Sequence, residues 1–271
     1  MGKKFGSFFE GKVVWITGAS SGIGESLVKK LKDSGANLIL SARREDELVR
    51  VRNEAGWTEE NSLILPLDLE DFRSLKNLSE QAIAKFGKVD VLINNGGISQ
   101  RSFAHETSIS AYESILKVNF LGNIGLTLAL LPHFRERKKG WVVSISSVAG
   151  KFGVPLRSGY SATKFALTGF YEALRAENND RNLKVLLVYP GFVKTKISEN
   201  ALSGNGVKHG KMDEAILKGI DSNECAIEIL NAIVSERNEI IIAGPKEKIG
   251  IFLHKYFPDL FAIFLTKASV T

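Results

Sequence analysis

The sequence contains little of the chemistry on which several protein classes depend. Its single cysteine, Cys225, excludes a disulfide within the chain, and without a nearby base it is predicted to be a buried structural thiol. The four histidines are dispersed without metal-ligand spacing, so no metal site is expected. No apolar run approaches the ~20 residues that cross a bilayer, and the amino-terminal stretch lacks the apolar core of a signal peptide. These absences favour a cytoplasmic protein.

Charge and composition are those of a globular chain. The net charge is +6 over 271 residues, but the basic residues are scattered, and the only dense group, 135–139, lies at a predicted helix end where cations suit the dipole. We therefore expect no nucleic-acid partner and a surface with a mild attraction for anionic ligands. No linker or repeat divides the chain, so residues 1–271 are predicted to form a single domain.

Short apolar runs alternate with amphipathic segments along the whole chain. This alternation predicts an α/β fold in which helices cover both faces of a parallel sheet. Helices are expected at about 72–86, from Ser110 onward, where Glu113 completes capping-box spacing, and around Tyr160. The predicted strands are 12–16, 37–42, 63–67, 89–93, 141–145, 184–188 and 239–243.

The segment Tyr160-Ser161-Ala162-Thr163-Lys164 carries the clearest chemical signal. Four residues separate Tyr160 from Lys164, so on a helix they stack one turn apart on the same face. A cation there favours the phenolate and makes the tyrosine a usable proton donor and acceptor. Ser147, thirteen residues upstream at a strand end, could hold a carbonyl oxygen against Tyr160. Such geometry suits the reduction of a carbonyl or the oxidation of an alcohol.

A glycine-rich turn supplies the second signal. The strand 12–16 runs into TGASSGIG (17–24), and an amphipathic helix with Leu27, Val28 and Leu31 follows. Glycines in such a turn let the backbone approach a pyrophosphate, and the helix N-terminus adds free N–H groups and partial positive charge. A glycine-rich turn alone is weak evidence, because a plain tight turn has the same composition. Its position between a strand and a helix strengthens the interpretation.

These motifs resemble those of the short-chain dehydrogenase/reductase family. The match runs through TGASSGIG (17–24), NNGG (94–97), Asn119, Ser147, YSATK (160–164) and PG (190–191), in the family's order. The stretches LSARR (40–44), PLDLED (66–71) and NNGGISQRS (94–102) look closest to the dehydrogenase/reductase member 7 branch, which is similar to 11β-hydroxysteroid dehydrogenase. The resemblance covers the chain from about residue 11 to at least residue 243.

The resemblance implies one doubly wound Rossmann-type domain with a mostly parallel seven-stranded sheet in the order 3-2-1-4-5-6-7. It implies that Asn119, Ser147, Tyr160 and Lys164 are catalytic. Tyr160 would exchange the proton, Ser147 would stabilise the oxygen, and Lys164 would lower the pKa of Tyr160 and bind the nicotinamide ribose. Asn119 would hold a water linked to Lys164. The implied cofactor contacts are Gly18, Ser20, Ser21, Gly22, Ile23, Gly24, Arg43, Arg44, Asp68, Asn94, Gly96, Tyr160, Lys164, Pro190, Gly191, Val193 and Thr195.

The end of the second strand predicts the cofactor. NAD-preferring sites place a carboxylate there, whereas this chain has Arg43 and Arg44, whose guanidiniums could bind a 2′-phosphate. We therefore predict NADP(H), with Arg43 as the main contact and Ser20 or Arg44 as secondary ones. The alternative is that these arginines merely start a surface helix.

Three further positions have roles implied by the resemblance. Asp68 would contact the adenine amino group, although a helix-starting carboxylate is an equal alternative. Asn94 would bind backbone and steady the central sheet, and Thr195 would hold the nicotinamide carboxamide. Gly96 replaces a frequent family alanine, which could loosen its loop.

The carboxyl-terminal part is expected to determine specificity and location. Residues 192–220, rich in Gly, Ser and Asn between Ser198 and Met212, resemble a substrate lid. The apolar tail, 245–271, could cover the core and a dimer surface, wall a lipophilic pocket, or dock peripherally on the endoplasmic reticulum or another membrane. The long helices from Ser110 and around Tyr160 resemble the family's dimer interface, so a homodimer or homotetramer is expected.

The sequence therefore predicts an NADP(H)-dependent oxidoreductase acting on a lipophilic carbonyl or alcohol, such as a steroid, retinoid or quinone. An NAD-dependent alcohol dehydrogenase of the same fold is the nearer alternative. A cofactor-bound sensor or scaffold without turnover is the more distant one.

Overall fold

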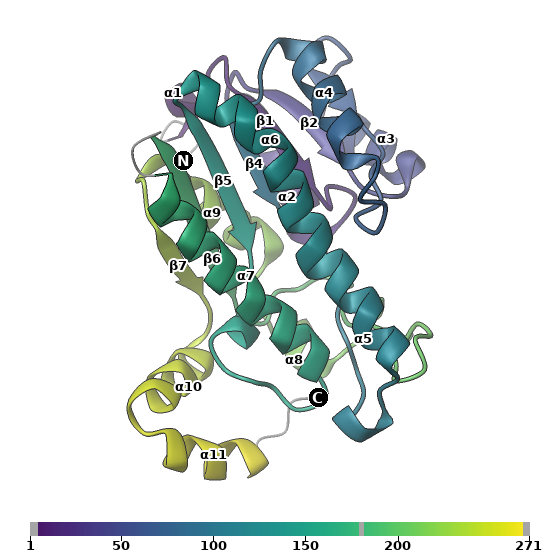
Figure 1. The fold of residues 1–271 in the computed structure, drawn as a ribbon, viewed down its shortest axis with the longest axis vertical. Coiled ribbons are helices and arrows are strands. Elements are labelled where there is room, and N and C mark those ends of the chain that lie inside the picture. Colours follow the sequence, from purple (N-terminus) through teal and green to yellow (C-terminus); the bar gives the residue numbers. More distant parts are fainter. Residues whose placement is uncertain (1–4, 179–181, 268–271) are drawn as a thin grey trace.

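The computed structural model describes residues 5–178 and 182–267, and its centre is a single β-sheet (Figure 1). The strand order is β3-β2-β1-β4-β5-β6-β7, which confirms the predicted topology. Every pairing is parallel, where a mostly parallel sheet was expected. The strands are β1 (Val13–Thr17), β2 (Asn37–Ser41), β3 (Ser62–Ile64), β4 (Val91–Asn94), β5 (Gly140–Ile145), β6 (Leu183–Pro190) and β7 (Glu239–Ile242).

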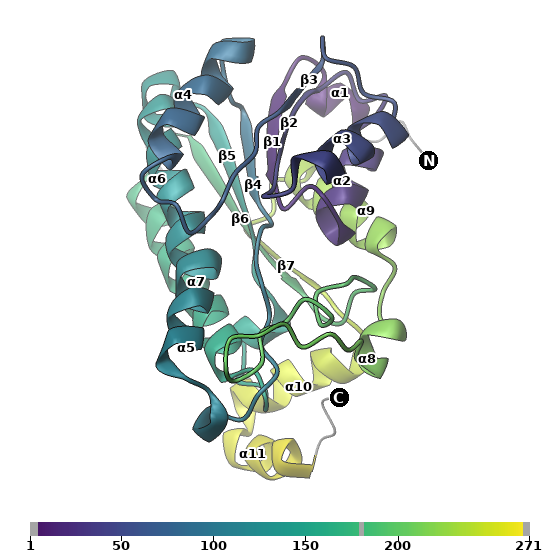
Figure 2. The ribbon, with the colours of Figure 1, turned by 90° about the vertical axis from the view of Figure 1, so that its right-hand side faces the viewer.

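Helices cover both faces of this sheet, as Figure 2 shows. One face carries α4 (Leu75–Phe86), α5 (Ile109–Leu116), α6 (Asn123–Arg137) and α7 (Ser158–Glu177). The other face carries α1 (Gly6–Phe9), α2 (Gly22–Lys30), α3 (Glu45–Glu54) and α9 (Ser222–Val234). Beyond the carboxyl ends of the strands lie α8 (Glu214–Leu217), α10 (Pro245–Tyr256) and α11 (Pro258–Lys267).

Alternation along the strands explains the two layers. In β1, Val14 and Ile16 pack with α2 and α9, whereas Val13 and Trp15 pack with α6 and α7. Both sets of side chains are buried, which gives the continuous apolar run typical of a parallel strand. Cys225 lies inside α9 in the first layer, and burial raises the pKa of its thiol to about 12. The predicted structural thiol is therefore confirmed.

The helix expected to begin at Ser110 begins earlier. Ser108 is the N-cap residue, and its Oγ accepts a hydrogen bond from the Ala111 amide at 3.2 Å. The predicted Ser110–Glu113 capping box is therefore wrong, because Ser110 already lies inside the helix and Ser108, with extended backbone, is the residue that caps it. From α5 the helix continues through a π-helical segment, η2 (Lys117–Gly122), into α6.

This continuous helix also corrects the expectation that no apolar segment could cross a membrane. Ile109–Arg137 has 29 residues and is long and apolar enough to do so by length and composition alone. In the fold, however, Leu126, Leu130 and Phe134 on this helix are buried in the layer packed against the sheet. The core helix of a globular protein passes the same test, so the apolar character is explained by packing on one face.

The sheet order reverses between β1 and β4, and this point positions the candidate site. Consecutive strands leave it in opposite directions, so the loops after β1 and β4 diverge and leave room for a ligand at the carboxyl edge. Loops 17–22 and 95–103, the short η3 helix (Val148–Gly150) and the segment after β6 all meet at this edge.

Candidate active site

Helix α7 brings Tyr160 and Lys164 to the same cavity. Both residues are buried and line a cavity of about 100 Å³ at the carboxyl edge of the sheet. The Lys164 Nζ lies 5.5 Å from the centre of the Tyr160 ring. The helical spacing in the sequence therefore places the phenol and the ammonium as neighbours.

Lys164 is held by backbone. Its Nζ donates a hydrogen bond to the Ile145 carbonyl, at the end of β5, at 2.9 Å. Burial lowers the pKa of this ammonium to about 8, well below the ordinary 10.5. Lys164 is therefore a cation whose charge is easily lost, next to a group expected to exchange protons.

The pKa of Tyr160 differs from the sequence expectation. Burial raises this pKa, and the Ser147 hydroxyl and the guanidiniums of Arg157 and Arg101 act to lower it. Lys164 is not among the groups that shift this pKa. Its effect on the phenol therefore stays a prediction. Desolvation of the phenolate is the largest cause of the raised pKa, and the Lys164 ammonium donates its hydrogen bond to the Ile145 carbonyl.

Ser147 and Ser146 end β5 in different environments. Both serines line the cavity, and the Ser147 Oγ accepts from the Ala149 amide at 3.1 Å and donates to the Pro190 carbonyl at 3.4 Å. The Ser146 Oγ instead donates to the Lys164 carbonyl at 3.1 Å, inside helix α7. Of the two serines, Ser147 is the one whose hydrogen bond lowers the pKa of Tyr160, in line with the predicted spacing.

Asn119 lies in the π-helical segment and fixes the loop after β4. Its Oδ1 accepts from the Ile98 amide, and its Nδ2 donates to the Ile98 carbonyl, both at 2.8 Å. The same Nδ2 donates to the Thr163 Oγ1 at 3.2 Å, one residue before Lys164. π-Helical turns of this kind are frequent at functional sites. The role of Asn119 in holding a water stays a prediction, while its positioning of loop and helix is direct.

The glycine-rich turn has no room for a side chain at its glycine positions. A Cβ on Gly18 would lie 2.9 Å from Asn95 Nδ2, and one on Gly24 would lie 2.2 Å from the Gly18 carbonyl oxygen. Gly18 and Gly22 also adopt left-handed backbone, with φ of 64° and 58°. The turn therefore requires glycine at these positions, and it brings bare backbone and the N-terminus of α2 to the carboxyl edge. Ser20, Ser21 and Ile23 occupy the same turn.

The two arginines after β2 differ from a third arginine nearby. Arg43 and Arg44 are exposed, and neither forms an ion pair in the part of the chain that the structure describes.

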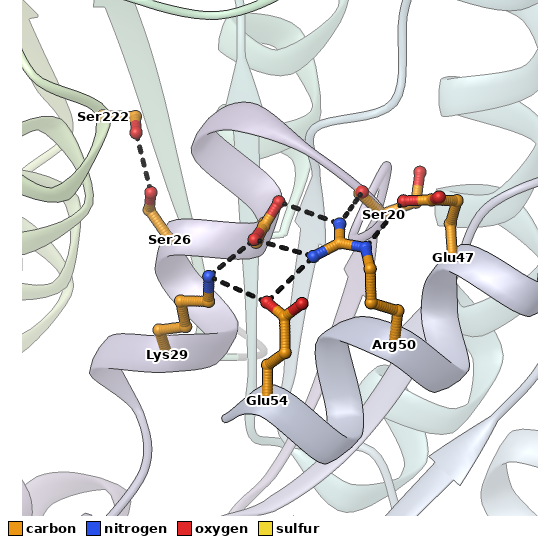
Figure 3. A network of polar contacts seen from close by, with 8 residues as sticks. Ser20, Ser26, Lys29, Glu47, Arg50, Glu54 and Ser222 are labelled. Atoms are coloured by element: carbon orange, nitrogen blue, oxygen red, sulfur yellow. Dashed lines mark hydrogen bonds and ion pairs between the residues drawn. The ribbon is translucent and has the colours of Figure 1, made fainter. Parts of the chain in front are cut away.

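Figure 3 shows that Arg50 in α3 is instead surrounded by carboxylates and also donates to the Ser20 carbonyl at 3.4 Å. Its acidic partners are Glu25, Glu47 and Glu54. Arg50 therefore ties α3 to the glycine-rich turn, while Arg43 and Arg44 keep their charge available. Arg44 also forms the N-cap position of α3, so part of the surface-helix alternative applies to it.

Asp68 does not start a helix and Asn94 does not bind backbone through its side chain, while the contact of Asp68 with adenine stays a prediction. Asp68 is exposed after β3, and its Oδ1 accepts from the Glu70 amide at 3.0 Å, so it forms a turn rather than starting α4. The Asn94 Nδ2 donates to Thr127 Oγ1 and Tyr171 OH, which are side chains and not backbone.

The backbone-binding role expected of Asn94 belongs to Asn95. The Asn95 Nδ2 donates to the carbonyls of Thr17 and Gly18 at 3.1 and 3.2 Å, and so ties β4 to the glycine-rich turn. Beside it, the Gly96 amide donates to Thr17 Oγ1 at 3.0 Å. A Cβ on Gly96 would lie 2.8 Å from Leu69 Cδ1, so the space of the absent methyl group is filled.

The segment after β6 closes the other side of the cavity. Pro190, Gly191, Val193 and Thr195 line it together with Ile23 from the glycine-rich turn. Thr195 also lies against Gly22, whose Cβ would come 2.9 Å from the Thr195 Cγ2. Arg43 and Arg44 follow β2, and Asp68 follows β3. These predicted cofactor contacts therefore lie farther along the carboxyl edge of the sheet and do not line the cavity.

Sequence reasoning did not identify four further residues around the site. The Gln100 Oε1 accepts from the amides of Gly159 and Tyr160 at 2.7 and 3.3 Å, which fixes the first turn of α7. Arg101 and Arg157 line the cavity, and Asp213 binds both of them. The only available signal was that Arg101 follows the NNGG motif closely, and that signal does not distinguish it from a surface arginine.

These residues fit a dinucleotide with a nicotinamide at the cavity. The glycine-rich turn offers backbone N–H groups at the N-terminus of α2, and the unpaired Arg43 could bind a phosphate. No group of metal-binding side chains is found among residues 5–178 and 182–267. The arrangement can bind a cofactor along the sheet edge and exchange a proton with an oxygen between Ser147 and Tyr160.

Comparison with known proteins agrees with this geometry. Residues 12–206 match the family model described as short chain dehydrogenase. The chain is 39% identical over 272 residues to a dehydrogenase/reductase SDR family protein 7-like of Drosophila melanogaster, covering 99% of this chain and 83% of the relative. It is 38% identical to human dehydrogenase/reductase SDR family member 7, with coverages of 91% and 74%. A short chain dehydrogenase/reductase of Burkholderia phymatum, solved in complex with NAD, has the same fold, with a TM-score of 0.81, 23% identity and coverages of 93% and 95%.

Proposed function

The chain belongs to the short-chain dehydrogenase/reductase family, and we propose that it is an NADP(H)-dependent oxidoreductase that interconverts a carbonyl and an alcohol on a lipophilic substrate. The observation that carries this proposal is the convergence of Ser147, Tyr160 and Lys164 on one buried cavity beside the glycine-rich turn. When bound, the nicotinamide cofactor supplies the hydride chemistry.

Each side chain has a separate part in the proposed reaction. Tyr160 gives a proton to the substrate oxygen during reduction and takes it back during oxidation. Ser147 donates a hydrogen bond to the same oxygen, where negative charge develops in the transition state. Lys164 binds the ribose hydroxyls, and its pKa of about 8 lets it accept or release protons near neutral pH.

The cavity wall supports a lipophilic substrate. Phe192, Val193, Ile197 and Ile216, all from segment 192–220, give the cavity an apolar part of its lining. Its volume of about 100 Å³ is small beside the ~300–1,000 Å³ of typical ligand pockets. A bulky substrate therefore requires segment 192–220 to move, which supports the proposal that this segment acts as a lid.

Turnover with both cofactors tests the proposal. We expect NADPH-dependent reduction of lipophilic ketones and aldehydes, with NADPH used better than NADH. Equal or better use of NADH would favour the NAD-dependent alcohol dehydrogenase alternative. Binding of NADPH without turnover of any carbonyl or alcohol would favour a non-catalytic sensor.

Arg43 is predicted to determine the preference for NADPH. Arg43→Ser should raise the KM for NADPH by about 10–100-fold, because charge-assisted hydrogen bonds contribute roughly 1.5–3 kcal/mol each. The KM for NADH, which lacks the 2′-phosphate, should change much less. Arg44→Ser is the matched control and should have the smaller effect. An unchanged KM for NADPH in Arg43→Ser would remove Arg43 from the phosphate site.

A further inference from the structure

Two buried guanidiniums stand in the wall of the cavity. Arg101 follows β4 and is 7% exposed, and Arg157 precedes α7 and is 9% exposed. Both line the same cavity as Ser147 and Tyr160. Arginine is rarely buried without a partner of opposite charge, so these two side chains require an explanation.

A single carboxylate serves both arginines. Asp213, itself 7% exposed, comes from segment 192–220. Arg101 binds it in a fork, with Nε donating to Oδ1 at 3.1 Å and Nη2 paired with Oδ2. Arg157 makes one contact, from Nη2 to Oδ2 at 3.1 Å.

The sharing leaves the wall with excess positive charge and unused donors. The remaining Arg101 nitrogen, Nη1, donates to the Gln100 carbonyl at 2.8 Å, so each of the three nitrogens of that guanidinium has a partner. The Arg157 Nε and Nη1 donate no hydrogen bond to any residue in the described ranges. Glu247, whose Oε1 accepts from the Phe192 amide at 3.4 Å, does not line the cavity. One unit of positive charge on Arg157 therefore has no counter-charge.

Arg157 also lies where it can reach both a substrate and the lid. Its guanidinium carbon is 5.5 Å from the centre of the Phe192 ring, which is part of the apolar lining. The charges of Arg157 and Arg101 both act on the pKa of Tyr160, so the guanidiniums are close to the proposed proton donor. An anion bound at Arg157 would thus lie a short distance from the reacting carbonyl.

We propose that Arg157, together with Arg101, is an anion-binding subsite, and that the preferred substrate is a lipophilic carbonyl compound carrying a carboxylate or a phosphate. This inference rests on the proposed oxidoreductase function and narrows its substrate class. Asp213 keeps Arg101 neutralised and oriented, and the substrate anion supplies the second counter-charge through the free Arg157 donors.

Matched substrates test the subsite. The assay compares an aromatic oxo-acid, its methyl ester and the corresponding ketone phosphate monoester, each reduced with NADPH by the full-length enzyme. We expect kcat/KM to be about 10–100-fold higher for at least one anion than for the neutral ester, because charge-assisted hydrogen bonds are gained. Comparison of the carboxylate with the phosphate identifies which anion the subsite prefers. Equal or better turnover of the neutral ester would overturn the subsite while leaving the proposed function intact.

Variants of Arg157 distinguish recognition of the substrate anion from a purely structural role in holding segment 192–220. In Arg157→Gln the ratio of kcat/KM for anion over ester should fall by about 10–100-fold, and Arg157→Lys should restore part of it. If the arginines only fasten the lid through Asp213, both substrates would lose equally and the ratio would not change. Arg237→Gln, with the same charge change at an exposed turn before β7, should leave the ratio unchanged. The KM for NADPH, measured in parallel, shows whether the cofactor rather than the substrate uses the subsite, which would contradict the proposal.

Competitive inhibition of the wild-type enzyme by small anions tests the subsite without a substitution that could disturb folding. Benzoate and phenyl phosphate should inhibit reduction of the neutral ester competitively with respect to the ester, and benzamide should inhibit much less. Equal inhibition by benzamide would contradict the subsite. Absence of turnover with all three substrates would instead contradict the proposed function.

Discussion

At the residue scale, Lys164 is buried at a cost in stability. Its ammonium has one hydrogen bond, to the Ile145 carbonyl, and no carboxylate is paired with it among the described residues. The lowered pKa measures that cost, because the unfolded chain holds the proton more tightly than the folded chain does. Such destabilised groups are characteristic of catalytic sites.

This cost predicts a pH dependence of stability. The pKa of Lys164 is about 8 in the folded protein against 10.5 ordinarily, so between these values the unfolded chain binds more protons and stability rises with pH. The free energies of unfolding of the wild type and of Lys164→Met, measured by denaturant titration, should therefore converge or cross as pH rises. The wild type should gain about 3 kcal/mol relative to the variant as pH rises from about 8 to 10.5. A constant difference across that range would show that Lys164 is not destabilised by burial.

Residues of the site differed in how far the sequence could identify them. Tyr160 and Lys164 were accessible because their spacing reports a shared helix face, and Ser147 because it ends a strand just before that helix. Arg157 and Asp213 were not accessible, since lone charged residues usually lie on the surface and only the fold brings these two together. The exchange of Asn94 for Asn95 has a similar cause: adjacent strand residues point to opposite faces, and a shift of one cannot be seen in the sequence.

At the scale of elements, the tail helices α10 and α11 have an unusual surface. Phe261 is buried against Phe152, with ring centres 5.0 Å apart, and Gly250 packs beside them. Most other large apolar side chains of the tail are 52–59% exposed: Ile249, Phe252, Tyr256, Phe257, Leu260, Ile263 and Phe264. None of the described tail residues, 245–267, lines the cavity. Of the three expected roles, this surface best supports contact outside the molecule, with a membrane or with a second copy.

The tail therefore predicts peripheral membrane binding. Full-length protein should float with anionic vesicles of phosphatidylserine and phosphatidylcholine, because apolar side chains insert while Lys246, Lys248 and Lys255 meet the headgroups. The double variant Phe252→Glu and Leu260→Glu should stay in the soluble fraction and keep its kcat. The matched control Val207→Glu changes an exposed apolar residue outside the tail and should still float. Wild-type protein that remains soluble with these vesicles would exclude membrane docking.

Elements were the most predictable part of the fold. Every predicted strand is present, because parallel strands buried on both faces give continuous apolar runs. Boundaries were less certain. Helix α4 begins at Leu75 rather than near Phe72, since Asp68 and Asp71 hold the preceding residues in turns. The π-helical segment at Asn119 has no sequence signal, and Asn119 binds a loop residue, Ile98, that is distant in sequence.

At the scale of the whole molecule, the helices on one face leave an apolar surface. Leu121, Leu128 and Phe165, on the π-helical segment, α6 and α7, are each 40–48% exposed. Leu121 and Leu128 also line a shallow groove together with Phe72. Exposed patches of this kind mark contact surfaces, and the location agrees with the dimer interface expected from the family.

Association is therefore predicted to use this face. Light scattering after size exclusion should give a homodimer or homotetramer for the wild type. The variants Leu128→Glu and Phe165→Glu should shift it toward monomer, because buried charges oppose association. Leu217→Glu, an exposed apolar residue on α8, should keep the wild-type mass. A monomeric wild type, or variants with unchanged mass, would contradict this interface.

The central claim is that Tyr160 exchanges the proton during hydride transfer at the cavity, and Tyr160→Phe tests it most directly. This variant keeps the ring and removes only the hydroxyl. We predict that kcat with NADPH and a reducible carbonyl falls by about 10²–10⁴-fold, while fluorescence titration shows NADPH still bound. Tyr112→Phe, which removes a hydroxyl bonded to Ser158, is the control and should keep most activity. Wild-type turnover in Tyr160→Phe would contradict the account.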